Sequence, residues 1–351
     1  MSRPSPSRRT VLRGLGLGTA AALTLTATAC GTGAPDASGA GGRVQVRIAY
    51  QAIPNADLVV KHQRLLEKAV PDADVRWVRF DSGADVNTAV ISGAVDVALA
   101  GSSPVTKGLS EPLDIPYKVA WIHDVIGDNE ALVAKKGIRS VKQLKGRKVA
   151  TPFGSTAHYS LLAALESAGL GAGDVRLVDL QPQDVLSAWQ RGDVDAAYVW
   201  TPTLDELAKD GRTLTTSRDV AEAGRPTADL GVVTDAFAAK HPDIVTAWLR
   251  AQDRAVRLAR KDPDKAAAAI AAELNVSPAQ AKRQLSQLVL LTADEQRGPE
   301  HLGTPGRPGK LAAHLHDAAR FLKDQKAVDA VPSQDALRSA LAVRELADAA
   351  K

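Results

Sequence analysis

The chain has 351 residues, of which 44 are Lys or Arg, 40 are Asp or Glu and one is Cys. Four of the basic residues are Arg within the first 29 positions, which hold no acidic residue, so the 40 that remain equal the acidic residues in number. This balance argues against a nucleic-acid partner held by a basic surface. A single cysteine also rules out a framework of internal disulfides.

The N-terminal segment has the pattern of an export signal followed by a lipid attachment site. Arg8-Arg9 precedes a weakly apolar run over residues 14–29, which is shorter than the roughly 20 residues that span a bilayer. The first 29 residues therefore resemble a removable twin-arginine signal peptide. Ala27-Thr28-Ala29-Cys30 resembles a lipoprotein box. We expect lipidation of Cys30 and an extracytoplasmic protein that is anchored to the cell membrane.

The segment after Cys30 is a predicted tether. Residues 31–42 are almost entirely Gly, Ala, Ser, Thr and Pro. Such a chain is flexible and would hold the next domain roughly 20 Å from the anchor. With Cys30 acylated, no thiol remains for catalysis or for a metal site. The folded part that starts at Arg43 is large enough to split into two lobes.

Strand and helix patterns alternate after the tether. A first strand with apolar residues at every second position is followed by an amphipathic helix, and two further strands enclose a second helix. This β-α-β-α-β pattern implies a parallel sheet with helices on its faces, hence an α/β fold. After Asp243 the chain is mostly helical, Ser277 to Gln280 form a predicted capping box, and Gly303 to Gly309 are expected to form a loop. The predicted early elements are Val44–Tyr50, a helix from Asp57, Val75–Phe80, a helix through Val86 and Val90, and Val95–Ala100.

An internal repeat supports two lobes. Residues 92–98 (SGAVDVA) recur as residues 191–197 (RGDVDAA), and each copy has a Gly where a helix would stop before a buried strand. The strands run into Ser103-Pro104 and Thr201-Pro202, which start the next helices. Each lobe therefore repeats one unit.

Three predicted helix starts point to an anion-binding site. They lie beyond the carboxyl ends of strands, where helix N–H groups are unpaired and the helix dipole favours negative charge. Hydroxyls and amides without Lys or Arg suit a small oxyanion. Alternatively, Ser103 and Thr201 only cap their own helices. The three starts are Gly101-Ser102-Ser103-Pro104, Gly154-Ser155-Thr156 and Trp200-Thr201-Pro202.

From Tyr50 to Thr216 the chain resembles the substrate-binding proteins of taurine ABC importers. The resemblance implies a two-lobed periplasmic-binding-protein fold of type II, with the ligand enclosed in a cleft between two α/β lobes. It also implies a membrane permease with a cytoplasmic ATPase as partner, and no enzyme activity. The family usually has an aromatic residue shortly after the Asp of its Pro-Thr-x-Asp segment, where this chain has Leu230-Gly231. The matching segments are FDSGA (80–84), GSSP (101–104), NEALV (129–133), STAHYSLLAAL (155–165) and AWQRGDVDAAYVW (188–200).

The resemblance divides the ligand site into an anion end and an ammonium end. At the ammonium end we expect Asp229 first and Glu130 second, with the ring of Trp200 facing the cation. Gln51 is a weaker candidate for a polar contact. Alternatively, Trp200 packs the lobe, Glu130 pairs with a surface Lys, and His158 is a surface residue. The sulfonate is assigned to Ser102, Ser103, Ser155 and Thr156 with their backbone amides, and to His158.

Two other functions stay open. The ligand could be another small anion, such as an alkanesulfonate or nitrate, although Asp229 and Glu130 favour a ligand that also carries positive charge. An enzyme on the same fold, such as a thiamine-pyrimidine synthase, is a further alternative. We expect no metal site, since His314 and His316 would face different sides of a helix. We also expect no cofactor and a monomer. The expected domains are 1–29 signal peptide, 30–42 tether, 43–133 first lobe, 134–225 second lobe, and 226–351 return to the first lobe with the C-terminal helices.

Overall fold

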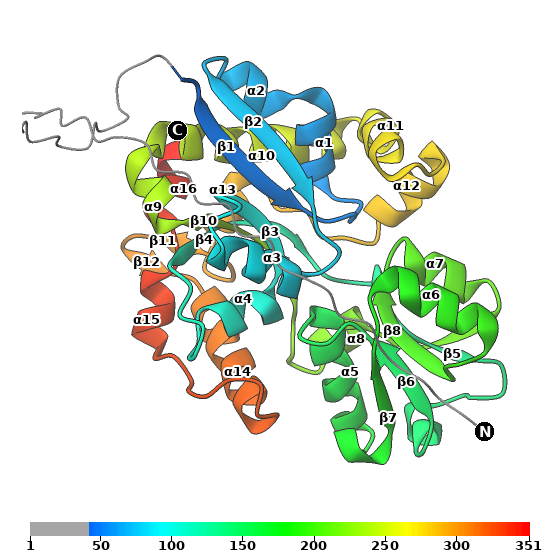
Figure 1. Cartoon of the computed structure of the whole chain (residues 1–351). Helices are drawn as coiled ribbons and strands as arrows, with labels where there is room; N and C mark the ends of the chain where they lie inside the picture. The colour runs from blue at the N-terminus through cyan, green and yellow to red at the C-terminus, as the bar shows by residue number, and fades with distance from the viewer. Residues whose placement is uncertain (1–41) are drawn as a thin grey trace, which may run out of the picture. The chain divides into compact units, whose positions relative to one another are not determined.

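The structure is a computed structural model that describes residues 42–351 (Figure 1). The predicted signal peptide, Cys30 and the tether up to residue 41 lie outside the described residues. In the described part, none of the helices combines the length and apolar character that a membrane crossing requires. Residues 43–351 form one compact unit, and the rest of this section concerns that unit.

The first sheet contains the predicted β-α-β-α-β segment. The strand Val44–Tyr50 is confirmed as β1, which pairs in parallel with β2 and β3. Two later strands, β10 and β4, extend the sheet in the antiparallel direction, so the sheet is mixed. Its order is β2 (Ala73–Arg79), β1, β3 (Val97–Gly101), β10 (Ala228–Thr234) and β4 (Tyr117–Val125), with helices α1 (Ala56–Gln63), α2 (Leu65–Ala69), α3 (Gly83–Ile91) and α4 (Ser102–Gly108) between the early strands.

The second sheet has the same plan. Its β6 pairs in parallel with β7 and β8, and β5 and β9 add antiparallel strands on the other side. The order is β7 (Arg176–Asp179), β6 (Lys148–Thr151), β8 (Ala196–Trp200), β5 (Glu130–Lys135) and β9 (Gly211–Thr216). The helices are η1 (Val141–Leu144), α5 (Thr156–Ser167), η2 (Ala172–Asp174), α6 (Pro182–Arg191), α7 (Thr203–Ala208) and α8 (Ser217–Glu222).

The sequence repeat occupies equivalent places in the two sheets. Gly93 and Gly192 follow α3 and α6 with φ of 69° and 78°, the left-handed conformation that ends helices. The chain passes to the second sheet before Glu130, because β5 pairs on both sides with strands of that sheet. The expected domain boundary after Val133 therefore falls within β5, whereas the one before residue 226 precedes β10.

The C-terminal third is mostly helical, as predicted. Ser277 caps its helix by accepting a hydrogen bond from the N–H of Gln280, although the Gln280 side chain contacts Asp205 instead of completing a capping box. The loop prediction for Gly303–Gly309 is wrong. That segment is a short hairpin in which Gly303, with φ of 81°, lies against the backbone of Gly309. The elements are α9 (Asp235–Lys240), α10 (Pro242–Lys261), α11 (Pro263–Leu274), α12 (Pro278–Leu285), α13 (Ala293–Gln296), β11 (Gly303–Thr304), β12 (Arg307–Pro308), α14 (Leu311–Asp324), α15 (Gln334–Ser339) and α16 (Val343–Ala349).

Each sheet has its own hydrophobic core. The core of the first sheet also takes in apolar residues of α10, α11, α12 and α16, so these helices belong to the first lobe. The second core is built from β5 to β8 with α5, α6 and α7. Helix α14 contributes to both cores, since Leu315 lies in the first and Phe321 in the second. Two separate cores give the two α/β lobes that the sequence predicted.

Candidate functional site

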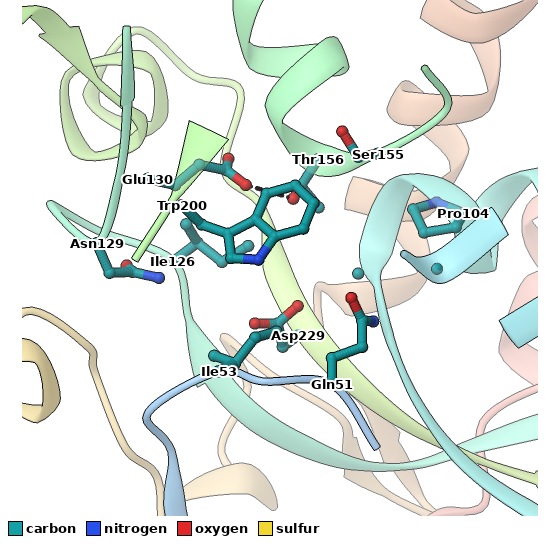
Figure 2. A pocket seen from close by; sticks show the side chains of 12 residues that line it. Gln51, Ile53, Pro104, Ile126, Asn129, Glu130, Ser155, Thr156, Trp200 and Asp229 are labelled. Atoms are coloured by element: carbon teal, nitrogen blue, oxygen red, sulfur yellow. Dashed lines mark hydrogen bonds between the residues drawn. The ribbon is translucent and has the colours of Figure 1, made fainter. Parts of the chain in front are cut away.

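A small cavity lies where strand ends of the two sheets face each other (Figure 2). Its free volume is about 20 Å³, which is room for roughly one water molecule. A ligand of several heavy atoms therefore requires the walls to move apart. The lining residues are Gln51, Ile53, Gly83, Gly101, Pro104, Ile126, Asn129, Glu130, Ser155, Thr156, Trp200 and Asp229.

Six of the nine predicted ligand residues line this cavity. They come from segments far apart in the chain, at the ends of β1 and β8, the starts of β5 and α5, and β10. All six are at least nine-tenths buried. In the view of Figure 2, Glu130 and Thr156 lie above the Trp200 ring, and Asp229 and Gln51 lie below it. The six are Gln51, Glu130, Ser155, Thr156, Trp200 and Asp229.

Ser102 and Ser103 are not among the residues that line the cavity. Helix α4 begins at Ser102 with Gly101 as its N-cap, so neither serine caps the helix. The Ser102 hydroxyl accepts a hydrogen bond from the N–H of Ala228 at 3.2 Å, and the Ser103 hydroxyl donates to the carbonyl of Gly154 at 3.4 Å. Both line a larger cavity, about 240 Å³, beside α14. Hydrogen bonds to the backbone of Ala228 and Gly154 therefore hold these hydroxyls outside the small cavity.

His158 also lies outside the cavity. Its Nδ1 accepts a hydrogen bond from the N–H of Gly154 at 3.2 Å, and its ring stacks on Phe153 with centroids 4.6 Å apart. Burial lowers the pKa of His158 to about 4, so the ring is neutral at pH 7. A neutral ring that supports the loop before α5 leaves the anion end to other groups.

The N-terminus of α5 forms one end of the cavity. Ser155 is the N-cap, and its hydroxyl accepts from the N–H of His158 at 3.1 Å and donates to Pro152 at 2.6 Å. The N–H groups of Thr156 and Ala157 have no acceptor among the described residues. Unpaired first-turn amides and the helix dipole favour an anion here. No Lys, Arg or His lines the cavity in the described part of the chain.

Glu130 is buried but well hydrogen-bonded. It accepts from the hydroxyls of Thr156 at 2.6 Å, Ser217 at 2.7 Å and Ser160 at 3.5 Å. Burial raises the pKa of Glu130 to about 7, although these hydroxyls oppose the shift. The first of these bonds is drawn in Figure 2. The alternative that Glu130 pairs with a surface Lys is therefore wrong.

Asp229 lacks the hydroxyl donors that surround Glu130 in the described part of the chain. Its carboxyl receives no side-chain hydrogen bond from the residues that the structure describes, and its neighbour across the sheet is another acid, Asp124. Burial, followed by the charges of Asp124 and Glu130, raises the pKa of Asp229 well above its usual range. Buried acids this close are stabilised in their charged forms by a nearby cation.

The sequence analysis missed Asp124. It is fully buried near the end of β4, where the amide of Asn55 donates to it at 3.2 Å. Burial raises its pKa to about 7. An acid near the end of the mostly apolar strand Tyr117–Val125, where it follows His123, was the available signal. Among residues 42–351 no three or more His, Cys, Asp or Glu side chains are grouped to hold a metal ion.

The two lobes touch beside the cavity at Gly101. A Cβ atom on this residue would lie 2.6 Å from Cγ2 of Thr156, closer than real side chains approach. Thr156 cannot rotate away without losing its hydrogen bond to Glu130. Glycine at position 101 therefore permits the close approach of the end of β3 to the start of α5.

Known proteins resemble this chain over most of its length. Residues 44–283 match the family model described as the substrate-binding domain of ABC-type glycine betaine transport systems. The chain is 37% identical to the taurine-binding periplasmic protein of Escherichia coli (strain K12) over 294 residues, which are 82% of this chain and 89% of that protein.

Solved structures with the same fold include two sulfonate-binding proteins. The alkanesulfonate-binding protein SsuA from Xanthomonas axonopodis pv. citri, bound to MOPS, aligns with a TM-score of 0.69 at 22% identity over 85% of this chain and 98% of that chain. The periplasmic aliphatic sulphonate binding protein SsuA from Escherichia coli aligns with a TM-score of 0.66 at 23% identity over 83% and 91% of the two chains. These alignments extend the likeness of fold over both lobes.

Proposed function

Since the chain belongs to the family of substrate-binding domains of ABC-type glycine betaine transport systems, we propose that it captures taurine outside the cytoplasm and delivers it to an ABC importer. The observation that carries this proposal is the pairing of two kinds of charge site in one cavity. Buried Asp229 and Glu130 suit a cation, and the N-terminus of α5 suits an anion. Taurine carries both groups on a two-carbon chain.

The form of the cation site favours a primary ammonium. A quaternary ammonium such as that of glycine betaine is recognised mainly by several aromatic faces. Among the described residues that line the cavity, Trp200 is the one aromatic side chain, and it accompanies two carboxyls. A primary ammonium can donate hydrogen bonds to those carboxyls. The anion end lacks Lys and Arg, which suits a sulfonate of low basicity held by amides.

Binding without chemistry is the simpler role for this cavity. In the described part of the chain its lining has no Cys, His or Lys, and its two acids, Asp229 and Glu130, are assigned to the ammonium of the ligand. The Ser155 hydroxyl is engaged as a helix cap, and the Thr156 hydroxyl donates to Glu130. The relative from Escherichia coli is itself named as a binding protein. We therefore favour capture and release over the alternative of an enzyme on this fold.

Calorimetric titration of the purified protein tests the proposal. Taurine should bind more tightly than ethanesulfonate, nitrate and glycine betaine, and NMR of the released ligand should show unchanged taurine. Equal or tighter binding of ethanesulfonate or nitrate would replace the zwitterion by a simple anion as ligand. Turnover of taurine would establish an enzyme instead.

We further propose that Cys30 is lipidated and that the protein acts as a monomer at the outer face of the cell membrane, next to its permease. Attachment of a protein to a membrane becomes stable when it has two anchoring signals, such as two acyl chains. Cys30→Ser should move the protein from the detergent phase to the aqueous phase, and Arg8→Lys with Arg9→Lys should leave precursor in the cytoplasm. Unchanged partition of the first variant argues against lipidation, and normal export of the second argues for the general secretory route.

A further inference from the structure

A second cavity lies on the other side of Trp200. It has a volume of about 130 Å³ and is lined by Ala52, Arg79 and Gln183, among other residues. Among the described residues, Trp200 is the one side chain that lines both this outer cavity and the inner cavity of about 20 Å³. The segment 51–53 runs between the two, because Gln51 and Ile53 line the inner cavity and Ala52 lines the outer one. Trp200 and this segment therefore form a wall.

The second lobe holds Trp200 in its place in the wall. Trp200 ends β8, where its backbone is paired with Glu130 of β5. The next residue, Thr201, donates its N–H to the carbonyl of Asn129 at 2.8 Å. The indole is 9% exposed. A large aromatic ring on a paired strand end has little freedom to swing aside.

The lining of the outer cavity is polar and includes the cationic side chain of Arg79. Arg79 lines it together with Asp81, which lies 3.7 Å away as a salt-bridge partner, and both side chains are about half exposed. Gln183 adds an amide from the start of α6. Such a space could hold the far end of a longer zwitterion, with an anionic group near Arg79. In the wild-type protein Trp200 separates that space from the carboxyls Asp229 and Glu130.

We propose that Trp200 sets the length of the ligand, by closing the inner cavity against aminosulfonates with more than two carbons between ammonium and sulfonate. This inference rests on the proposed function. One methylene too many in a closed apolar pocket typically changes affinity by about 10- to 200-fold. Removing the indole joins the two cavities and gives the longer chains room.

The test is calorimetric titration of taurine, 3-aminopropanesulfonate and 4-aminobutanesulfonate into wild type, Trp200→Ala and Trp200→Leu. Wild type should lose about tenfold or more in affinity per added carbon. In both variants the preference for taurine over the four-carbon ligand should fall by at least tenfold. The preference of Trp200→Phe for taurine over the four-carbon ligand should lie between that of wild type and that of the other two variants, because the smaller ring separates the two cavities only in part. Circular dichroism checks that each variant is folded, and Trp200→Leu keeps an apolar side chain if the alanine variant is unstable.

Gln190→Ala is the matched control, because Gln190 is an exposed residue of α6 that lines neither cavity, and the ligand ranking should stay unchanged. Equal loss of all three ligands in the Trp200 variants would overturn the inference and leave the proposed function standing. Wild-type binding of the four-carbon ligand as tight as that of taurine would do the same. If wild type binds none of the three, the proposed function fails, and the length limit fails with it.

Discussion

The two sheets have the same strand arrangement, and each carries a buried carboxyl at an equivalent position. The residues around the two carboxyls differ. In each sheet the last residue of the third strand is paired with an acid on the next, antiparallel strand. In the first lobe Gly101 is paired with Asp229, and in the second lobe Trp200 is paired with Glu130. Three hydroxyls donate to Glu130, whereas Asp229 faces a second acid, Asp124.

This difference assigns different roles to equivalent positions. Hydroxyls already satisfy the carboxyl of Glu130, so it can remain buried at modest cost. Asp229 has no such donors in the described part of the chain and adjoins a like charge, so a cation gains most by binding next to it. We therefore expect the main ammonium contact at Asp229, and we expect Glu130 to hold Thr156, at the start of α5.

The most direct way to break the comparison is to neutralise each acid in turn. Asp229→Asn should weaken taurine binding by roughly 30-fold to several thousand-fold, because losing one member of a buried charge pair costs about 2 to 5 kcal/mol. Glu130→Gln should cost about tenfold or less, since its hydroxyl partners remain. Ethanesulfonate should lose much less in both. Calorimetry measures all four affinities, with Asp235→Asn, an exposed acid of α9, as control.

Equal losses for the two variants would mean that the equivalent positions share one role. Loss of ethanesulfonate as severe as that of taurine would mean that Asp229 shapes the cavity and does not hold the ammonium.

The comparison also predicts a dependence on pH. Burial raises the pKa of Asp124 and Glu130 to about 7 and that of Asp229 well above its usual range, so Asp124 and Glu130 take up protons as the pH falls through 7 and Asp229 is protonated more readily than an ordinary Asp. An ammonium favours the charged carboxyl, so taurine binding must displace protons. Taurine affinity should therefore fall as pH falls below 7, by up to about tenfold per pH unit for each proton displaced.

The affinity for ethanesulfonate should change in the opposite direction and rise as the pH falls, because an anion binds better near protonated acids. Titrations from pH 5 to pH 8, in buffers of different ionisation enthalpy, measure the affinity and the number of protons released. A taurine affinity that is constant over this range would contradict the proposed contact with titrating acids.

The residues paired with the two acids offer a third test. Gly101→Ala places a methyl group 2.6 Å from Cγ2 of Thr156 at the contact between the lobes. We expect taurine affinity to fall by about tenfold, because Thr156 or the contact between the lobes must give way, whereas the backbone adds no strain, since the φ of Gly101 is −62°, which alanine accepts. Gly173→Ala is the control, since no atom lies within 4 Å of its added Cβ. An unchanged affinity for Gly101→Ala would show that the contact is dispensable for binding.

The smallest effect is expected at a contact between the lobes that involves neither acid. In the second lobe Asp205 of α7 accepts a hydrogen bond from Gln284 of α12, in the first lobe, at 2.7 Å (Figure 1). Gln284→Ala should weaken taurine binding by about twofold to tenfold, the usual net worth of one such bond, if closure of the lobes accompanies binding.

Lys282→Ala on the same helix is the matched control, because Lys282 pairs with Asp264 within the first lobe. If both variants bind taurine like wild type, the contact between α7 and α12 does not contribute to the bound state.

Local patterns in the sequence were enough to predict the first strand, the glycines that end α3 and α6, and the helix start at Ser155 and Thr156, both of which line the cavity. Alternating apolar residues, helix stops and caps act over a few residues, so a sequence carries them directly. The resemblance to a transport family added the placement of Asp229 and Glu130 in one cleft.

Tertiary structure decided what depends on register and on contact between segments far apart in the chain. The pairing of β10 with β3 and β4 brings Asp124 next to Asp229 and engages the hydroxyl of Ser102 with Ala228. Trp200 is recognisable from the sequence as a residue of the site, but its position between two cavities follows from the packing of both lobes. A one-residue change of strand register would reverse which side chains face the cleft. The partner strands of β10 lie far from it in the sequence, so its register follows from the tertiary pairing.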